Sequence, residues 1–103
     1  MLDKTTVMNI ANAYADAVKK DFSPLAVVLF GSYVRDEARD DSDIDIGVVF
    51  EGFEGDWLTT ASALWRLRHG ISYVIEPHLL DVKQDKSGFV RHVFKTGQVI
   101  YHA

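Results

Sequence analysis

Two short apolar runs on either side of a charged segment set the strongest limit on how this chain can fold. Residues 25–30 read LAVVLF, a continuous run rich in β-branched side chains, which is typical of a strand buried on both faces. Residues 43–50 read DIDIGVVF, and their side chains alternate between two faces. One face carries Ile44, Ile46, Val48 and Phe50, and the other carries Asp43, Asp45, Gly47 and Val49. Both runs therefore predict strands of one sheet, and two aspartates stand at the start of the second.

The other segments predict helices that alternate with strands. Apolar residues at helical spacing predict a helix over 3–20, with Asp3 as its N-cap, and another over 56–69, with Asp56 as its N-cap. The stripe of this second helix, which includes Trp57 and Trp65, is expected in the core, although Trp57 near the helix start could face a partner. The remaining expected elements are a short helical stretch over 32–39, a strand over 71–82, a short helix over 87–97 and a strand over 98–101. This order predicts an α/β (α+β) fold with a small mixed sheet of about four strands packed against helices.

Composition limits the class of protein. The 103 residues, 48% of them hydrophobic, fit a single domain over 1–103. A net charge of −4 argues against a long nucleic acid as the main partner. No apolar run approaches the roughly 18 residues that a membrane span needs, and no signal peptide is recognisable, so a cytoplasmic location without a membrane partner is expected. Because the chain has no cysteine, any metal must bind through oxygen or imidazole ligands.

Three carboxylates stand out against the apolar strands. Asp43 and Asp45 lie two residues apart on one strand face, roughly 6 to 7 Å between Cα atoms, so both can approach one divalent cation. The alternative is a half-exposed strand start with an acidic outer face. Glu76 interrupts the apolar run of 71–82, where an unpaired charge would be costly, although an exposed edge beside Pro77 would also explain it. His78 shares a face with Glu76 and could donate to it, but a structural or surface role is the favoured interpretation.

Gly31 and Ser32 follow the first strand, where a phosphate could bind. Glycine permits close approach of the backbone, and free amides at a helix start, together with the serine hydroxyl, favour an anion. The alternative is an ordinary turn with a serine cap. Arg35 and Arg39 could reach phosphates, or Arg35 could pair with an acidic neighbour within 36–41.

Gly31-Ser32, then Ser42-Asp43-Ile44-Asp45, then Glu76 together resemble the signature of the DNA polymerase β-like nucleotidyltransferase superfamily. The likeness is closest to its stand-alone minimal nucleotidyltransferase (MNT) domains of prokaryotes. The specific motif covers residues 30–46 and Glu76, and the order of predicted elements agrees over nearly the whole chain. The sequence departs from the family pattern at Asp36, where relatives often have Gly, at Asp40, where Pro is frequent, and at Glu76, where many members use Asp.

This resemblance implies a polymerase β-like fold and transfer of a nucleotide from ATP with two Mg²⁺ ions. Asp43 and Asp45 would bridge both ions, and Glu76 would bind the ion that activates the attacking hydroxyl. Gly31 and Ser32 would hold the β and γ phosphates. Arg35 and Ser42 would complete the nucleotide site, with Arg35 adding positive charge.

The chain is too short to carry the additional acceptor-binding domains of larger members, so the acceptor is expected from outside. For stand-alone members, the resemblance implies a helical partner of the HEPN type, an AMP placed on a partner Tyr hydroxyl, and an antitoxin role. The alternative is a catalytically weak module of the same fold that neutralises or regulates a partner by docking alone. An oligomeric state stays open.

Overall fold

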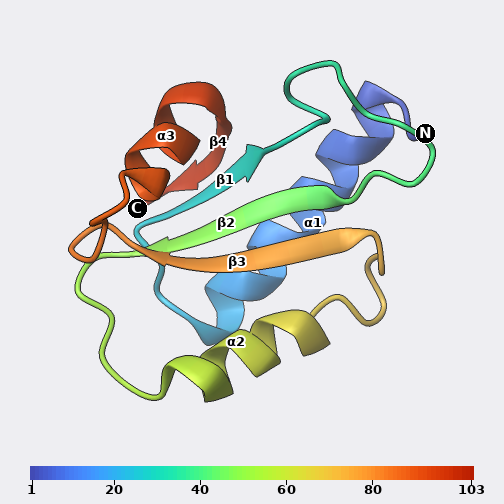
Figure 1. Ribbon diagram of the computed structural model, residues 1–103. Helices are drawn as coiled ribbons and strands as arrows, with labels where there is room; N and C mark the ends of the chain where they lie inside the picture. The colour runs from blue at the N-terminus through green and yellow to red at the C-terminus, as the bar shows by residue number, and fades with distance from the viewer.

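A four-stranded mixed sheet forms the centre of the structure, a computed structural model that describes residues 1–103 (Figure 1). The strands lie in the order β3-β2-β1-β4, and three helices pack on the two faces of this sheet. In chain order the elements are α1 (Lys4–Asp21), β1 (Ala26–Phe30), β2 (Ile44–Phe50), α2 (Trp57–Arg66), β3 (Ile75–Asp81), α3 (Phe89–Thr96) and β4 (Gln98–His102). The predicted α+β class with a mixed sheet of about four strands is confirmed.

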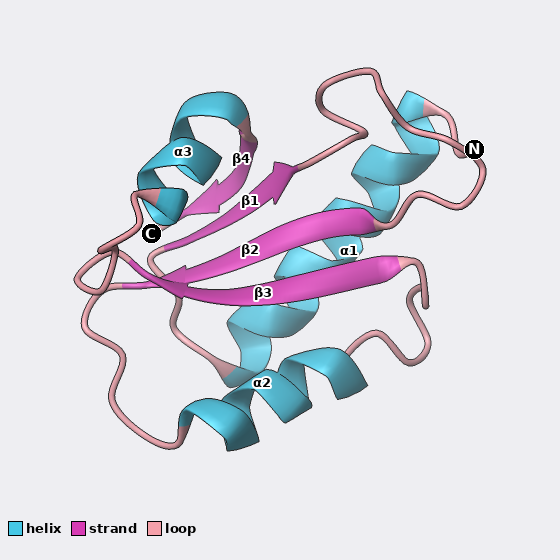
Figure 2. Ribbon diagram, in the orientation of Figure 1, coloured by secondary structure: helices cyan, strands magenta, loops and turns pink.

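The pairing of the strands decides which parts of the chain meet. β1 is antiparallel to both β2 and β4, whereas β3 runs parallel to β2 (Figure 2). β1 therefore ends at the same end of the sheet at which β2 and β3 begin. In the register, Phe30 lies opposite Asp45, and Asp45 lies opposite Glu76. Three segments that are distant in sequence thus meet at one end of the sheet.

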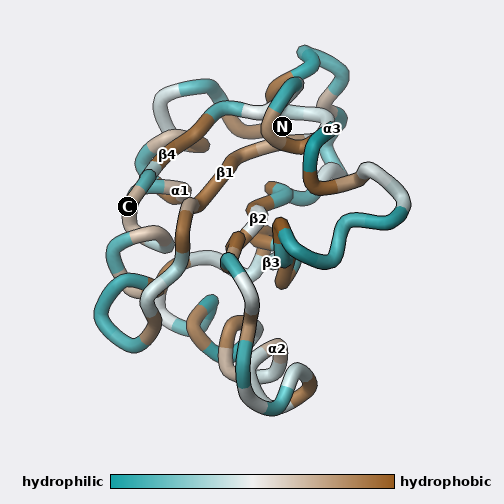
Figure 3. The backbone as a smooth tube through the Cα atoms, turned by 90° about the vertical axis from the view of Figure 1, so that its left-hand side faces the viewer, coloured by the Kyte–Doolittle hydropathy of each residue, from teal (hydrophilic) through white to brown (hydrophobic).

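Two hydrophobic clusters hold the helices on the sheet. α1 and α2 cover one face and α3 covers the other (Figure 1). Along β2, Ile44, Ile46 and Val48 pack in the cluster of α1 and α2, as the alternation predicts. Tyr14 of α1 joins the two helices, because its buried hydroxyl donates to the carbonyl of Leu64 in α2 at 2.7 Å. Figure 3 shows β1 as hydrophobic along its length and the long loops as largely hydrophilic.

Asp81 organises the opposite end of the sheet, where β2 and β3 finish. It is the one buried charged residue, 3% exposed. Its carboxylate accepts backbone hydrogen bonds from Gly52 at 2.9 Å, Phe53 at 2.7 Å and Lys83 at 2.9 Å. The connections over 51–56 and 82–88 are therefore tied to one side chain at the end that lies away from the acidic residues.

Side chains define the starts of all three helices. Asp3 accepts from the Thr6 amide at 2.7 Å, and Asp56 accepts from the Thr59 amide at 3.3 Å, so both predicted caps are confirmed. The first amide of α3, that of Phe89, donates to the Ser87 hydroxyl at 3.3 Å. The next two amides, of Val90 and Arg91, donate to Asp85, which the sequence did not single out. None of the three helices has the length and apolarity that crossing a membrane would require.

Residues 32–39 do not form the predicted short helix. The chain makes turns over 32–36, and one helix-like bond, from the Arg35 amide to the Gly31 carbonyl at 3.2 Å, is not continued. Asp36 has a φ of +57°, in the left-handed region, through which a right-handed helix cannot pass. Asp36 thus adopts a conformation that glycine favours.

The expected burial of Trp65 is wrong, and Trp57 has the exposed position that was the alternative to burial for it. Trp57 is 46% exposed and Trp65 is 41% exposed, and Leu64 is the buried residue of α2. α2 packs chiefly on the edge strand β3, so a narrow strip of the helix meets the sheet. Trp57 instead packs edge-on against Phe53, and the Arg68 guanidinium lies 4.1 Å above the ring of Trp65.

Candidate active site

Asp45 is the centre of the acidic site, because several groups surround its carboxylate. The register places it between Phe30 on β1 and Glu76 on β3. Its Oδ1 lies 3.0 Å from Nε2 of His78. Its Oδ2 lies against Gly31, where a Cβ atom would overlap it, and Gly31 also has a φ of +85°. Glycine is therefore required at the corner after β1 for Asp45 to keep this position.

Glu76 completes a compact group of possible ligands. One ligand atom each from Asp45, Glu76 and His78 lies within 4.8 Å of the other two. Burial raises the pKa of the Glu76 carboxyl above its usual range, His78 lowers it, and the negative charges of Asp45 and Asp43 raise it further. The negative charge of Asp45 beside Glu76 favours a cation between the two carboxylates. Oxygen donors without a thiolate fit a hard divalent ion such as Mg²⁺.

Asp43 lies at the edge of this group. It directly precedes β2, its side chain is exposed, and it is not among the three residues whose ligand atoms lie within 4.8 Å. Its charge nevertheless acts on Glu76. The structure thus brings Asp45 and Glu76 together as expected and leaves Asp43 on the solvent side of the pair, so its part in binding a cation stays a prediction.

The corner after β1 offers backbone donors. The carbonyl of Gly31 accepts from the amides of Val34 at 3.1 Å and Arg35 at 3.2 Å, which closes a tight turn. The amides of Ser32 and Tyr33, at the start of this turn, donate to no other backbone or side-chain group. Adjacent free amides at a turn form an anion-binding concavity. The phosphate site predicted at Gly31-Ser32 thus has available donors although no helix follows it.

The other predicted nucleotide residues are engaged with their neighbours. Nε of Arg35 lies 3.2 Å from the Glu37 carboxylate, and both side chains are exposed. The hydroxyl of Ser42 accepts from the Arg39 amide at 2.8 Å. Arg35 therefore has the acidic neighbour that the sequence offered as an alternative, and Ser42 closes the loop that leads into β2.

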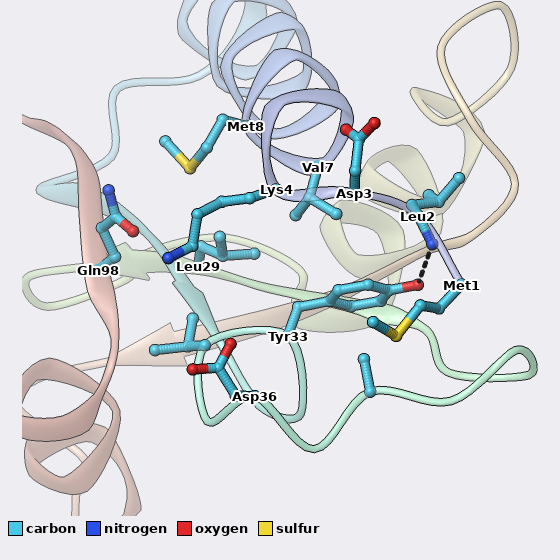
Figure 4. A pocket seen from close by; sticks show the side chains of 12 residues that line it. Met1, Leu2, Asp3, Lys4, Val7, Met8, Leu29, Tyr33, Asp36 and Gln98 are labelled. Carbon is cyan, nitrogen blue, oxygen red and sulfur yellow. Dashed lines mark hydrogen bonds between the residues drawn. The ribbon is translucent and has the colours of Figure 1, made fainter.

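The two cavities of the molecule lie away from the acidic group. One, of about 320 Å³, lies between the start of α1 and the loop after β1 (Figure 4). The Tyr33 hydroxyl accepts from the Leu2 amide there at 3.3 Å, and Lys4, Asp36 and Gln98 also line the cavity. The other, beside α3, is lined by six residues that include Asp85 and Arg91. Asp45 and Glu76 line neither cavity, and both residues are partly exposed.

A family model described as polymerase beta nucleotidyltransferase matches residues 12–103, which include the Gly31 corner and all three carboxylates. The chain belongs to this nucleotidyltransferase family. The resemblance drawn from Gly31-Ser32, Asp43, Asp45 and Glu76 is thereby confirmed, and the chain is a nucleotidyltransferase of the minimal, MNT type.

Relatives with assigned names agree with this membership. The protein adenylyltransferase MntA of Thermococcus cleftensis is 41% identical over 51 residues, which are 50% of this chain and 52% of the relative, so the match spans about half of each. A provisionally named protein adenylyltransferase of Methanocaldococcus jannaschii is 30% identical over 100 residues, which are 95% of this chain and 93% of the relative.

Solved structures show the same fold. A provisionally named nucleotidyltransferase from Sulfolobus solfataricus matches with a TM-score of 0.69 and 26% identity, over 95% of this chain and 82% of that chain. A chain from the complex of a tri-AMPylated HEPN toxin of Shewanella oneidensis with its MNT antitoxin matches with a TM-score of 0.60 and 18% identity, over 94% and 73%. At the latter identity the likeness concerns the fold.

His78 contacts the acidic site, whereas the sequence favoured a structural or surface role for it. Its place two residues after Glu76 predicted a shared face, but nothing local pointed to Asp45. Its ring lies 4.9 Å from that of Phe30, and its Nε2 reaches Asp45. The signal lies in the parallel register, which sets His78 opposite Gly47 and beside Asp45.

Proposed function

We propose that this nucleotidyltransferase is a protein adenylyltransferase that transfers AMP from ATP to a Tyr hydroxyl of a HEPN-type partner protein and thereby acts as an antitoxin. The observation that carries the proposal is the convergence of Asp45 and Glu76 beside a turn with two free amides. Two relatives are named as protein adenylyltransferases, which supports AMP as the transferred group. A structural neighbour was solved in complex with a HEPN toxin, which supports a partner of that kind.

The carboxylates would hold the cations. Asp45 and Glu76 offer the central oxygens, and Asp43 would add its carboxylate from the exposed side. Two bound Mg²⁺ ions would stabilise the entering and leaving oxygens of an in-line displacement. Without a cation, these negative charges would repel a nucleotide triphosphate, so ATP binding should depend on a divalent ion.

The turn after β1 would orient the triphosphate. The amides of Ser32 and Tyr33 and the Ser32 hydroxyl would donate to the β and γ phosphates. Arg35 would exchange Glu37 for a phosphate oxygen, and its exposed position allows this movement. Ser42 would act by fixing the loop into β2 through its bond to the Arg39 amide.

At the α-phosphorus the reaction forms one bond and breaks one. The acceptor hydroxyl oxygen attacks the α-phosphorus and its proton passes to solvent water. The bond from the α-phosphorus to the bridging oxygen of the β-phosphate breaks, and pyrophosphate leaves with that oxygen. Asp45 and Glu76 are partly exposed and Asp43 is exposed, which supports access by a Tyr side chain of another protein.

The test combines the wild-type protein, labelled ATP, Mg²⁺ and the protein encoded beside it. Label is expected on the partner, and a partner whose acceptor Tyr is changed to Phe should stay unlabelled. The double variant Asp43→Ala and Asp45→Ala should bind the partner without labelling it. Partner binding by the wild type without any Mg²⁺-dependent transfer would refute the enzyme and leave a docking module.

A further inference from the structure

His78 is fixed at the inner side of the acidic site by two contacts. Its Nε2 lies 3.0 Å from Asp45 Oδ1, and its ring lies 4.9 Å from the Phe30 ring at an angle of 60°. The side chains are 28% exposed for His78 and 22% for Asp45, so this hydrogen bond is partly shielded from water. A hydrogen bond to a carboxylate is strengthened in such surroundings.

The register places His78 on the far side of Asp45 from Asp43. Asp45 lies opposite Glu76, and the next residues on the same face, Gly47 and His78, lie opposite each other. Asp43 is one step away from Asp45 in the other direction along the strand. A cation shared by Asp43, Asp45 and Glu76 would be held from the Asp43 side, whereas His78 reaches Asp45 from the Gly47 side.

Gly47 fits the packing beside this pair. A Cβ atom at Gly47 would lie 3.1 Å from Leu80 Cδ1, closer than ordinary van der Waals contact, and 3.6 Å from the Phe30 ring. A larger side chain at Gly47 would therefore press on Leu80 and lie against Phe30, the ring that His78 contacts.

The geometry points to His78 as a positioning residue that holds Asp45 Oδ1 and leaves Oδ2, beside Gly31, for the cation. The bond requires the proton on Nε2, which donates to the carboxylate. Holding one oxygen fixes the plane of the carboxylate before a cation arrives, and partners of this kind tune metal affinity in other sites. The inference rests on the proposed function, because it assumes that Asp45 binds a cation.

A direct-ligand role for His78 predicts something different. Two neighbouring ligands of an octahedral ion with bonds of about 2.1 Å are separated by about 3.0 Å, which is also the observed distance from Nε2 to Oδ1. A ligand must offer a free nitrogen lone pair, whereas a positioning residue must offer an N–H group. A glutamine amide can supply the N–H group, but it cannot supply the imidazole nitrogen.

The experiment measures Mn²⁺ binding by the free-ion signal in electron paramagnetic resonance, with no nucleotide present. The proteins are the wild type, His78→Ala, His78→Gln and the control His92→Ala, which removes an exposed imidazole on α3. His78→Ala should weaken Mn²⁺ binding about 10-fold or more. His78→Gln should recover most of that loss, His92→Ala should match the wild type, and pulsed spectra of bound Mn²⁺ should lack coupling to an imidazole nitrogen.

Three results would overturn the positioning role: unchanged Mn²⁺ affinity in His78→Ala, His78→Gln as weak as His78→Ala, or nitrogen coupling in the wild type. The coupling measurement needs no variant and so holds even where His78→Ala does not fold. AMP transfer is assayed in parallel. A His78-dependent Mn²⁺ site without AMP transfer would refute the proposed function alone, and normal transfer with no effect of His78 would refute the positioning role alone.

Discussion

Replacing Gly31 by Ala, compared with a control variant at another glycine, should distinguish damage to the acidic site from loss of fold stability. A Cβ atom there would overlap Asp45 Oδ2 and lie 3.0 Å from Asp45 Cγ. Carbon atoms pack at about 3.5 to 4.0 Å, so the carboxylate must retreat by roughly 0.5 to 1 Å. A displacement of about 1 Å in a reacting site can cost about 10²-fold in rate, and we expect a loss of that size in AMP transfer.

Gly70→Ala is the matched control. Gly31 and Gly70 have nearly the same φ, +85° and +82°, but no atom lies within 4 Å of a Cβ at Gly70. Forcing alanine into the left-handed region costs about 1 to 2 kcal/mol in either variant. For a domain of this size, that corresponds to a fall in Tm of about 5 to 15 °C.

The assay compares Tm by circular dichroism, Mn²⁺ affinity without nucleotide, and AMP transfer at a temperature where all variants are folded. Gly70→Ala should lose stability and keep both activities. Gly31→Ala should lose at least as much stability, about 10-fold in Mn²⁺ affinity and about 10²-fold in transfer. Wild-type Mn²⁺ affinity in Gly31→Ala would show that Asp45 does not depend on this corner.

Three further variants test individual side chains. The pKa of Glu76 is raised in the folded state, so the free energy of unfolding without a divalent ion falls as the pH rises through that pKa. Glu76→Gln should therefore raise Tm at neutral pH. The same variant should lower AMP transfer at least about 10²-fold. Tyr14→Phe removes the donor to Leu64 and should lower the free energy of unfolding by about 1 kcal/mol, read by urea denaturation, with transfer unchanged. Burial alone would raise the pKa of Asp81, but three amide bonds outweigh it and lower that pKa. Asp81→Asn should thus cost about 2 kcal/mol at neutral pH, and its difference from wild type in urea melts should shrink as the pH falls below the ordinary Asp value.

Local patterns predicted the strands well because each strand is short and strongly patterned. The alternation from Ile44 to Val48 fixed which side of β2 faces α1 and α2, and the side chain of Asp45 had to lie on the other side. The caps Asp3 and Asp56 are also local, because an N-cap contacts amides three residues away.

Predictions from the sequence failed where a backbone conformation or a residue distant in sequence determines the structure. The run from Ser32 to Arg39 has helical composition, but the left-handed Asp36 breaks it. Trp57 and Trp65 have helical spacing, yet α2 meets the edge of the sheet and has too little surface to cover them. His78 acquires its contact with Asp45 from the parallel register, which no short window of sequence contains.

The hydrogen bonds of Asp81 to the connections that follow β2 and β3 have a consequence for engineering. Residues 51–56 and 82–88 leave the sheet at the end away from Asp45 and Glu76, with one carboxylate anchoring their first turns. Beyond those anchored amides, chain length can change without altering the distances among the cation ligands. Reporter peptides or accessory segments grafted there would extend the molecule at the end of the sheet away from Asp45 and Glu76. The surface around these carboxylates would stay the same.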